Sequence, residues 1–228
     1  MAVTPELISH AVDDSDRALG ALIAAVRELP DGKGVGASAL PGWTRGHVLA
    51  HVDGVGRALA RQAEYAARGE TITPYDGGRP GRDAAIEAGS RRTMTEHVAE
   101  LETVRERLRS AWPEPGSPLW SAPVEYRDGV VADALLAWWR EVRIHAVDAR
   151  VGIGAGTWDA ALLDHLREFL AVRLPDDAAD LELVGAPTDV TAWLAGRRPD
   201  GPVAARRDGV EVPLPELGPW PAAGAPGR

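Results

Sequence analysis

The sequence predicts a mainly α-helical protein, a four-helix bundle followed by a small α+β C-terminal domain. Long segments between residues 5 and 151 repeat apolar residues at helical spacing, and glycine and proline fill the connections between them. After residue 157 the segments become shorter and include three β-like runs. We therefore predict a helical bundle over residues 1–156, an α+β domain over 157–220 and a disordered tail over 221–228.

The first two helices are predicted from their start signals. Residues 5–29 form the first helix, because Pro5 follows Thr4 and proline suits the first helical position. Residues 44–68 form the second, with Thr44 as the N-cap. The first segment repeats apolar residues at helical spacing, which indicates that one face of this helix is buried.

The next two helices are predicted from their apolar stripes and from the loops around them. Residues 69–81 contain several glycines and prolines and predict a long loop, a kind of segment that often carries function. A third helix is predicted over 82–111 and a fourth over 131–151, with an irregular connection at 113–131. The stripe of the third helix consists of Ile86, Met94, Val98, Leu101, Val104 and Leu108.

The C-terminal domain is predicted to mix helices and strands. Helices are expected over 158–173 and 188–194, and a strand over 180–184. Residues 203–207 and 210–213 predict a hairpin, because the Asp-Gly pair between them is a strong turn signal.

Composition excludes several classes of function. The chain has 228 residues and a net charge of −9, without a dominant basic patch, so nucleic acid is not an expected partner. No apolar run is as long as the roughly 18 residues that a membrane helix needs, and the N-terminus does not resemble a signal peptide, so we expect a cytoplasmic protein. Cysteine is absent, so any thiol chemistry needs a thiol from outside the chain.

Three polar side chains could form a metal site inside the bundle. Glu141 and His145 lie four residues apart in WWREVRIHAVD, which places them on one helix face. His51 lies on the second predicted helix in WTRGHVLAHVDG, and His47 shares its face, so either could supply the third ligand. Two nitrogens and one carboxylate leave a tetrahedral zinc one open position, as catalytic sites require. The alternative interpretation is an ordinary Glu–His surface pair. A carboxylate among the apolar neighbours of Glu141 would need a partner such as a metal if it were buried, so the pattern alone leaves both interpretations open.

Several motifs together resemble one known family. LPGWTRGHVLAHVDG, TPYDGG followed by RDAAIEAGSRR, and WWREVRIHAVD resemble the mycothiol-dependent maleylpyruvate isomerase family, part of the wider group of DinB-like metal-binding bundles. The stretch ELVGAPTDVTAWLAGR and the later LPELGPW are similar to that family's C-terminal domain. The resemblance implies zinc bound by His51, Glu141 and His145, with His47 as the second candidate ligand. It also implies mycothiol as the thiol cofactor.

The resemblance further implies a reaction. A zinc-bound thiolate adds to the cis double bond of maleylpyruvate, the resulting single bond rotates, and elimination gives fumarylpyruvate and returns the thiol, a step of aromatic catabolism. The substrate carries two carboxylates, so an arginine clamp is expected. Candidates for binding substrate or thiol are Arg82, the nearby loop residue Tyr75, Arg197 and Arg206.

The chain departs from the family in the turn after His51. Members commonly carry an asparagine and an aspartate there, whereas this chain has Val55 and Arg57. This departure keeps two alternatives open. One is a mycothiol S-transferase that acts on another electrophile, and the other is a metal-binding or ligand-binding module without turnover.

Overall fold

The computed structural model describes residues 3–178 and 180–221. The chain divides into two compact units, with the boundary between Gly154 and Ala155, and each is described by itself. The first unit is a helical bundle and the second combines helices with a three-stranded antiparallel sheet, which confirms the predicted fold class. Of the predicted tail, residues 222–228 lie outside the described part of the chain.

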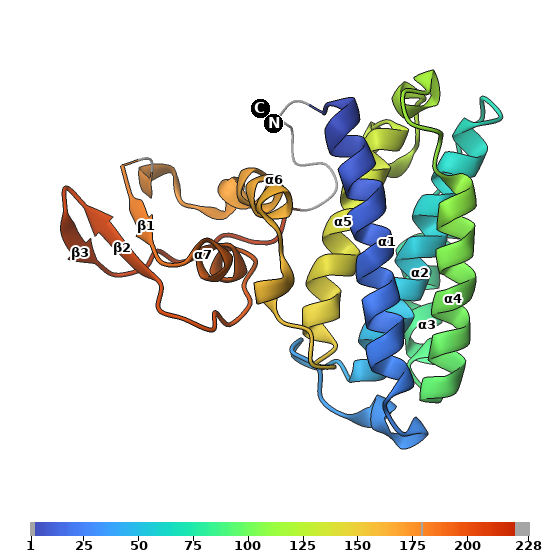
Figure 1. Cartoon of the computed structure of the whole chain (residues 1–228), viewed down its shortest axis with the longest axis horizontal. Helices are drawn as coiled ribbons and strands as arrows, with labels where there is room; N and C mark the ends of the chain where they lie inside the picture. Colours follow the sequence, from blue (N-terminus) through green and yellow to red (C-terminus); the bar gives the residue numbers. More distant parts are fainter. Residues whose placement is uncertain (1–2, 179, 222–228) are drawn as a thin grey trace. The chain divides into compact units, whose positions relative to one another are not determined.

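Four long helices build the bundle (Figure 1). These are α1 (Pro5–Arg27), α2 (Arg45–Ala66), α4 (Met94–Ala111) and α5 (Val131–Asp148). Helices α1 and α2 each pack against both α4 and α5, so the four surround one core. The shorter α3 (Gly78–Gly89) packs on α2.

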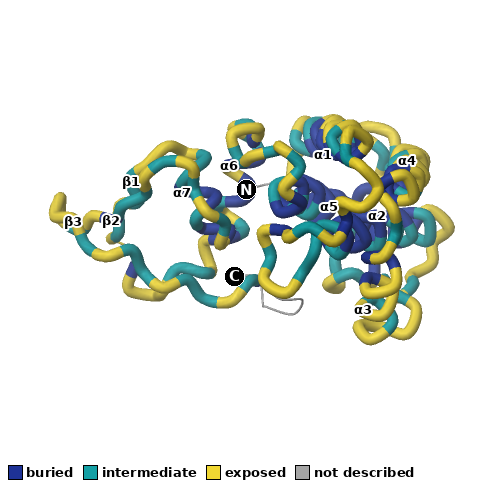
Figure 2. Tube along the Cα trace, turned by 90° about the horizontal axis from the view of Figure 1, so that it is seen from below, coloured by how far each residue is buried: buried dark blue, intermediate teal, exposed yellow. Residues whose placement is uncertain are grey.

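The core of the bundle is made by apolar side chains from all four long helices. Leu22, Leu49, Leu101 and Trp138 are each at most 1% exposed, and Ile86 and Gly89 are the buried residues of α3. Figure 2 shows buried segments along α2 and α5 and a mostly exposed α3. No helix in the described part of the chain is long and apolar enough to cross a membrane.

The predicted start signals of the first two helices are confirmed. The Thr4 hydroxyl accepts a hydrogen bond from the backbone N–H of Leu7 at 3.2 Å, and Pro5 takes the first helical position. Thr44 caps α2 through the backbone N–H of His47. Such caps satisfy amides that the helix leaves without a partner.

The prediction of one continuous helix over 82–111 is wrong. The chain forms α3 and α4 instead, and α3 begins at Gly78, inside the predicted loop. The break falls before Thr93, whose side chain accepts from the backbone of Glu96 while the Glu96 carboxylate accepts from the backbone of Thr93. This capping box starts a new helix although the apolar stripe continues across the break.

The second unit contains α6 (Ala160–Leu170), α7 (Pro187–Leu194) and the strands β1 (Glu182–Val184), β2 (Ala204–Arg207) and β3 (Val210–Val212). The strands form an antiparallel sheet in the order β1-β2-β3. The predicted hairpin is confirmed, because both residues of its Asp-Gly turn have positive φ angles, 51° and 78°. Positive φ at both central positions is the geometry that twists a two-residue hairpin correctly.

Candidate metal centre

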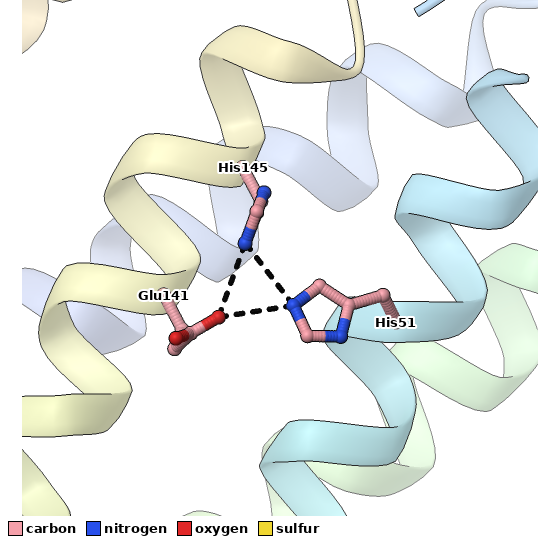
Figure 3. A group of neighbouring side chains, drawn as sticks. All are labelled: His51, Glu141 and His145. Atoms are coloured by element: carbon pink, nitrogen blue, oxygen red, sulfur yellow. Dashed lines mark hydrogen bonds and ion pairs between the residues drawn. The ribbon is translucent and has the colours of Figure 1, made fainter. Parts of the chain in front are cut away.

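Three of the predicted ligand side chains converge between α2 and α5 (Figure 3). The Nε2 atom of His51 lies 3.0 Å from the Oε2 atom of Glu141 and 3.1 Å from the Nε2 atom of His145. The third side of the triangle, from His145 Nε2 to Glu141 Oε2, is 3.1 Å. Glu141 and His145 are one helical turn apart on α5, and His51 reaches them from α2. The helix spacing read from the sequence therefore brings these three residues together.

The donor set and its spacing fit a divalent metal. Two imidazole nitrogens and one carboxylate oxygen are ligands that zinc accepts, at bond lengths of about 2.0–2.2 Å. Two ligands of a tetrahedral zinc then lie about 3.3 Å apart, close to the 3.0–3.1 Å seen here. Among the residues that the structure describes, His51, Glu141 and His145 form the group of histidine and acidic side chains whose ligand atoms lie close enough together to hold one metal ion. Three protein ligands leave room for an external one.

The protonation states of the three side chains depend on one another. Burial would raise the pKa of Glu141, but hydrogen bonds from His145 and His51 hold it well below its usual value. Burial lowers the pKa of His51, and the charge of His145 lowers it further. Burial also acts to lower the pKa of His145, yet hydrogen bonds to Asp148 and Glu141 raise it to about 9. The cluster thus keeps its proton on His145, and a metal would have to displace that proton.

A buried carboxylate that the sequence reasoning missed lies behind His145. The Oδ2 atom of Asp148 accepts a hydrogen bond from His145 Nδ1 at 2.8 Å, and Asp148 is fully buried. This bond fixes the tautomer that leaves Nε2 facing the cluster, which is the usual arrangement behind a metal-binding histidine. The signal was present in the sequence as His145 followed three residues later by an aspartate, at the same-face spacing. Trp43 adds an apolar wall, edge-on to His51 with ring centroids 5.5 Å apart.

A cavity of about 220 Å³ opens beside His51. Tyr75 and Arg82 line it, as do residues of α2, α3 and α4. The Arg82 guanidinium donates to His51 Nδ1 at 3.2 Å. Burial raises the pKa of Tyr75 to about 12, an effect that the nearby charge of Arg82 opposes, so the phenol stays protonated. A cation and a hydroxyl donor therefore lie next to the candidate metal position.

Comparison with known proteins agrees with this geometry. Residues 15–150, more than half of the chain, match the family described as the mycothiol maleylpyruvate isomerase N-terminal domain. The chain belongs to this family. It is named for an enzyme, so the chain is a member of an enzyme family. None of the curated proteins matches the chain.

Two solved structures share the fold of this member of the mycothiol maleylpyruvate isomerase family. One is a mycothiol-dependent maleylpyruvate isomerase, with a TM-score of 0.79 and 23% identity. The other is a histidine-to-alanine mutant of a mycothiol-dependent maleylpyruvate isomerase, with a TM-score of 0.78 and 22% identity. Both alignments cover 93% of this chain and 97% of the other. The likeness therefore extends over both units.

The remaining predicted site residues of this family member are described by their own local contacts. His47 belongs to the cap of α2, with Nδ1 beside Thr44 at 2.7 Å and Nε2 beside Glu87 at 3.2 Å, so its ring nitrogens face away from the cluster. Arg197 and Arg206 belong to the second unit. Arg197 lies over the ring of Trp220, and Arg206 is exposed on β2. Of the predicted binding residues in the first unit, Tyr75 and Arg82 line the cavity beside His51.

Proposed function

We propose that this protein is a zinc-dependent and mycothiol-dependent cis–trans isomerase that converts maleylpyruvate to fumarylpyruvate by thiolate addition, bond rotation and elimination. The observation that carries the proposal is the convergence of His51, Glu141 and His145 at 3.0–3.1 Å in a chain without cysteine. Membership of the mycothiol maleylpyruvate isomerase family supports the choice of thiol and substrate.

The residues around the cluster have distinct roles in this proposal. Zinc bound there would lower the pKa of a thiol placed in its open position, so that the thiol reacts as the thiolate. Asp148 holds His145 in orientation, and Glu141 supplies a negative charge. Arg82 offers a guanidinium to one carboxylate of the substrate, since arginine matches carboxylates bidentately. The protonated Tyr75 offers its hydroxyl hydrogen to an oxygen that gains negative charge during addition.

Metal analysis tests the ligand assignment. His51→Ala, Glu141→Ala and His145→Ala are each expected to lose most of the bound zinc, because a site with two ligands left binds the metal weakly. His47→Ala is the matched control, since this histidine lies one turn earlier on α2 but faces Thr44 and Glu87. Full occupancy in all three ligand variants would contradict the assignment, and loss of zinc in His47→Ala would move the third ligand to His47.

A turnover assay tests the reaction. With zinc and mycothiol present, maleylpyruvate is expected to be converted to fumarylpyruvate without net consumption of mycothiol. Omitting mycothiol is expected to abolish the conversion, because the chain has no thiol of its own. Robust isomerisation without any thiol would refute the mechanism.

A mycothiol S-transferase is the second candidate. Val55 and Arg57, the two positions that depart from the family pattern, both line the cavity beside His51, where they would contact the electrophile. A transferase would consume mycothiol and release a thioether, so mass spectrometry of the products separates the two activities. A stable mycothiol adduct and no fumarylpyruvate would favour the transferase.

A further inference from the structure

The cavity beside His51 also carries two arginines on either side of a buried aspartate. Arg57 Nε donates to Asp53 Oδ1 at 2.6 Å, and a guanidinium N–H of Arg92 donates to Asp53 Oδ2 at 3.1 Å. The Asp53 side chain is only 6% exposed, and all three residues line the cavity. One carboxylate thus holds two guanidinium groups in place, one from α2 and one from the α3–α4 connection.

This arrangement leaves donors available to a ligand. Arg57 also pairs with Glu100, a residue of α4 whose side chain is 38% exposed. Among the described residues, Asp53 is the one side chain to which Arg92 donates a hydrogen bond, so its other N–H groups can donate to a ligand. A side chain at position 89 would crowd the Arg92 guanidinium, since a Cβ added at Gly89 would lie 3.3 Å from it. Arginine donors beside a wall of Ala50, Val55 and Ile86 suit an anion on a short carbon chain.

The arginine pair and His51 extend from α2 in different directions. His51 and Asp53 are two residues apart on α2, so their side chains leave the helix about 200° apart. Arg82 supplies a cation beside His51, and Arg57 and Arg92 supply two beside Asp53. The cavity volume of about 220 Å³ is smaller than the pockets of roughly 300–1,000 Å³ that hold drug-sized ligands. The cavity therefore suits a small molecule with an acidic group at each end.

We propose that Arg92 and Arg57, braced by Asp53, bind the carboxylate of the electrophile that lies farther from the metal, so that the cavity selects short dicarboxylates. This inference rests on the proposed function for the identity of the electrophile, and it adds the subsite that recognises the second acid group. Arg92 is the main contact, and Arg57 contributes the N–H groups that neither Asp53 nor Glu100 uses.

Calorimetric titration with two unreactive probes tests the subsite. Adipate has a saturated six-carbon chain with a carboxylate at each end, and hexanoate has the same chain with one carboxylate. Contacts that both probes make with Arg82 or a metal cancel in the comparison. The zinc-loaded protein is expected to bind adipate about tenfold more tightly than hexanoate, because a second carboxylate gains charge-assisted hydrogen bonds.

Single variants identify the residues responsible. Arg92→Gln and Arg57→Gln are each expected to remove most of the preference for adipate, and one arginine still pairs with Asp53 in each, so the buried carboxylate keeps a partner. Arg91→Gln is the matched control, because Arg91 is 76% exposed and pairs with Glu87 outside this cavity. Glu100→Gln is expected to tighten adipate binding, because it removes the carboxylate that competes for Arg57.

The results separate this inference from the proposed function. The titration needs neither thiol nor turnover, so an inactive protein that still prefers adipate through Arg92 supports the subsite and contradicts the isomerase. An equal affinity for the two probes in the unsubstituted protein, or no measurable adipate binding, would overturn the inference. The inference would also be overturned if both arginine variants keep the preference for adipate while circular dichroism shows that they are folded.

Discussion

The carboxylate behind His145 is expected to set the affinity of the metal centre. Asp148 accepts the Nδ1–H of His145 at 2.8 Å and is fully buried, so water does not screen the interaction. Asp148→Asn keeps the shape of the side chain and removes its charge, and the amide can present a donor where an acceptor is needed. Loss of such a partner lowers metal affinity about 10- to 100-fold, or about 1.4–2.7 kcal/mol. The complete burial of Asp148 favours the upper half of this range.

The assay is a zinc competition titration against a chelating dye. It is made at pH 9, since a proton on His145, whose pKa is raised to about 9, competes with the metal at lower pH. Asp13→Asn is the matched control, because it replaces the same carboxylate with an amide at an exposed position of α1. Melting temperatures of both variants show whether a lower affinity reflects misfolding. An Asp148→Asn protein that melts normally and binds zinc as tightly as the control would refute the reasoning.

Outcomes are also expected for four further variants. Gly46→Ala should lower the free energy of unfolding by about 1–3 kcal/mol in urea denaturation, because the added Cβ would lie 2.1 Å from the carbonyl oxygen of Ser90. The Cβ added by Gly54→Ala, on the same helix, meets no atom within 4 Å, so this variant should raise the free energy of unfolding by up to about 1 kcal/mol. Burial lowers the pKa of His97 to about 4, so the stability it contributes is present above pH 6.5 and is lost as the pH falls toward 4. The free energy of unfolding should therefore fall by up to about 3 kcal/mol less in His97→Leu between pH 7 and pH 4.5, as measured by denaturation curves at the two pH values. Tyr75→Phe should lower the rate of turnover about tenfold and leave the zinc content unchanged, because it removes only a hydroxyl donor.

The ligand triangle could be predicted from sequence because it depends on local geometry. Glu141 and His145 share a helix face wherever their helix lies, and a bundle core leaves few directions for a histidine of α2. The choice between His51 and His47 came from the family resemblance. The structure supplies a physical reason, since His47 sits in the first turn of α2 and is engaged by Thr44 and Glu87.

The walls of the cavity could not be predicted in the same way. Asp53 and Arg92 are far apart in the sequence, and no spacing rule relates them. Their contact depends on how α3 and α4 pack against α2. Arginine side chains on predicted helix surfaces are usually exposed to solvent, so the sequence offered no reason to select Arg92 over Arg91 as a cavity residue.

The break between α3 and α4 links the error in the predicted fold to Arg92, a cavity residue that the sequence did not single out. In one continuous helix over 82–111, Arg82 and Arg92 would lie ten residues apart, about 15 Å along the axis. The structure ends α3 at Gly89 and starts α4 after Thr93, and both arginines line the same cavity. The capping box of Thr93 and Glu96 is therefore a determinant of the pocket as well as of the helix. Its Thr-x-x-Glu pattern is visible in the sequence, and giving it more weight than the continuous apolar stripe would have placed the break correctly.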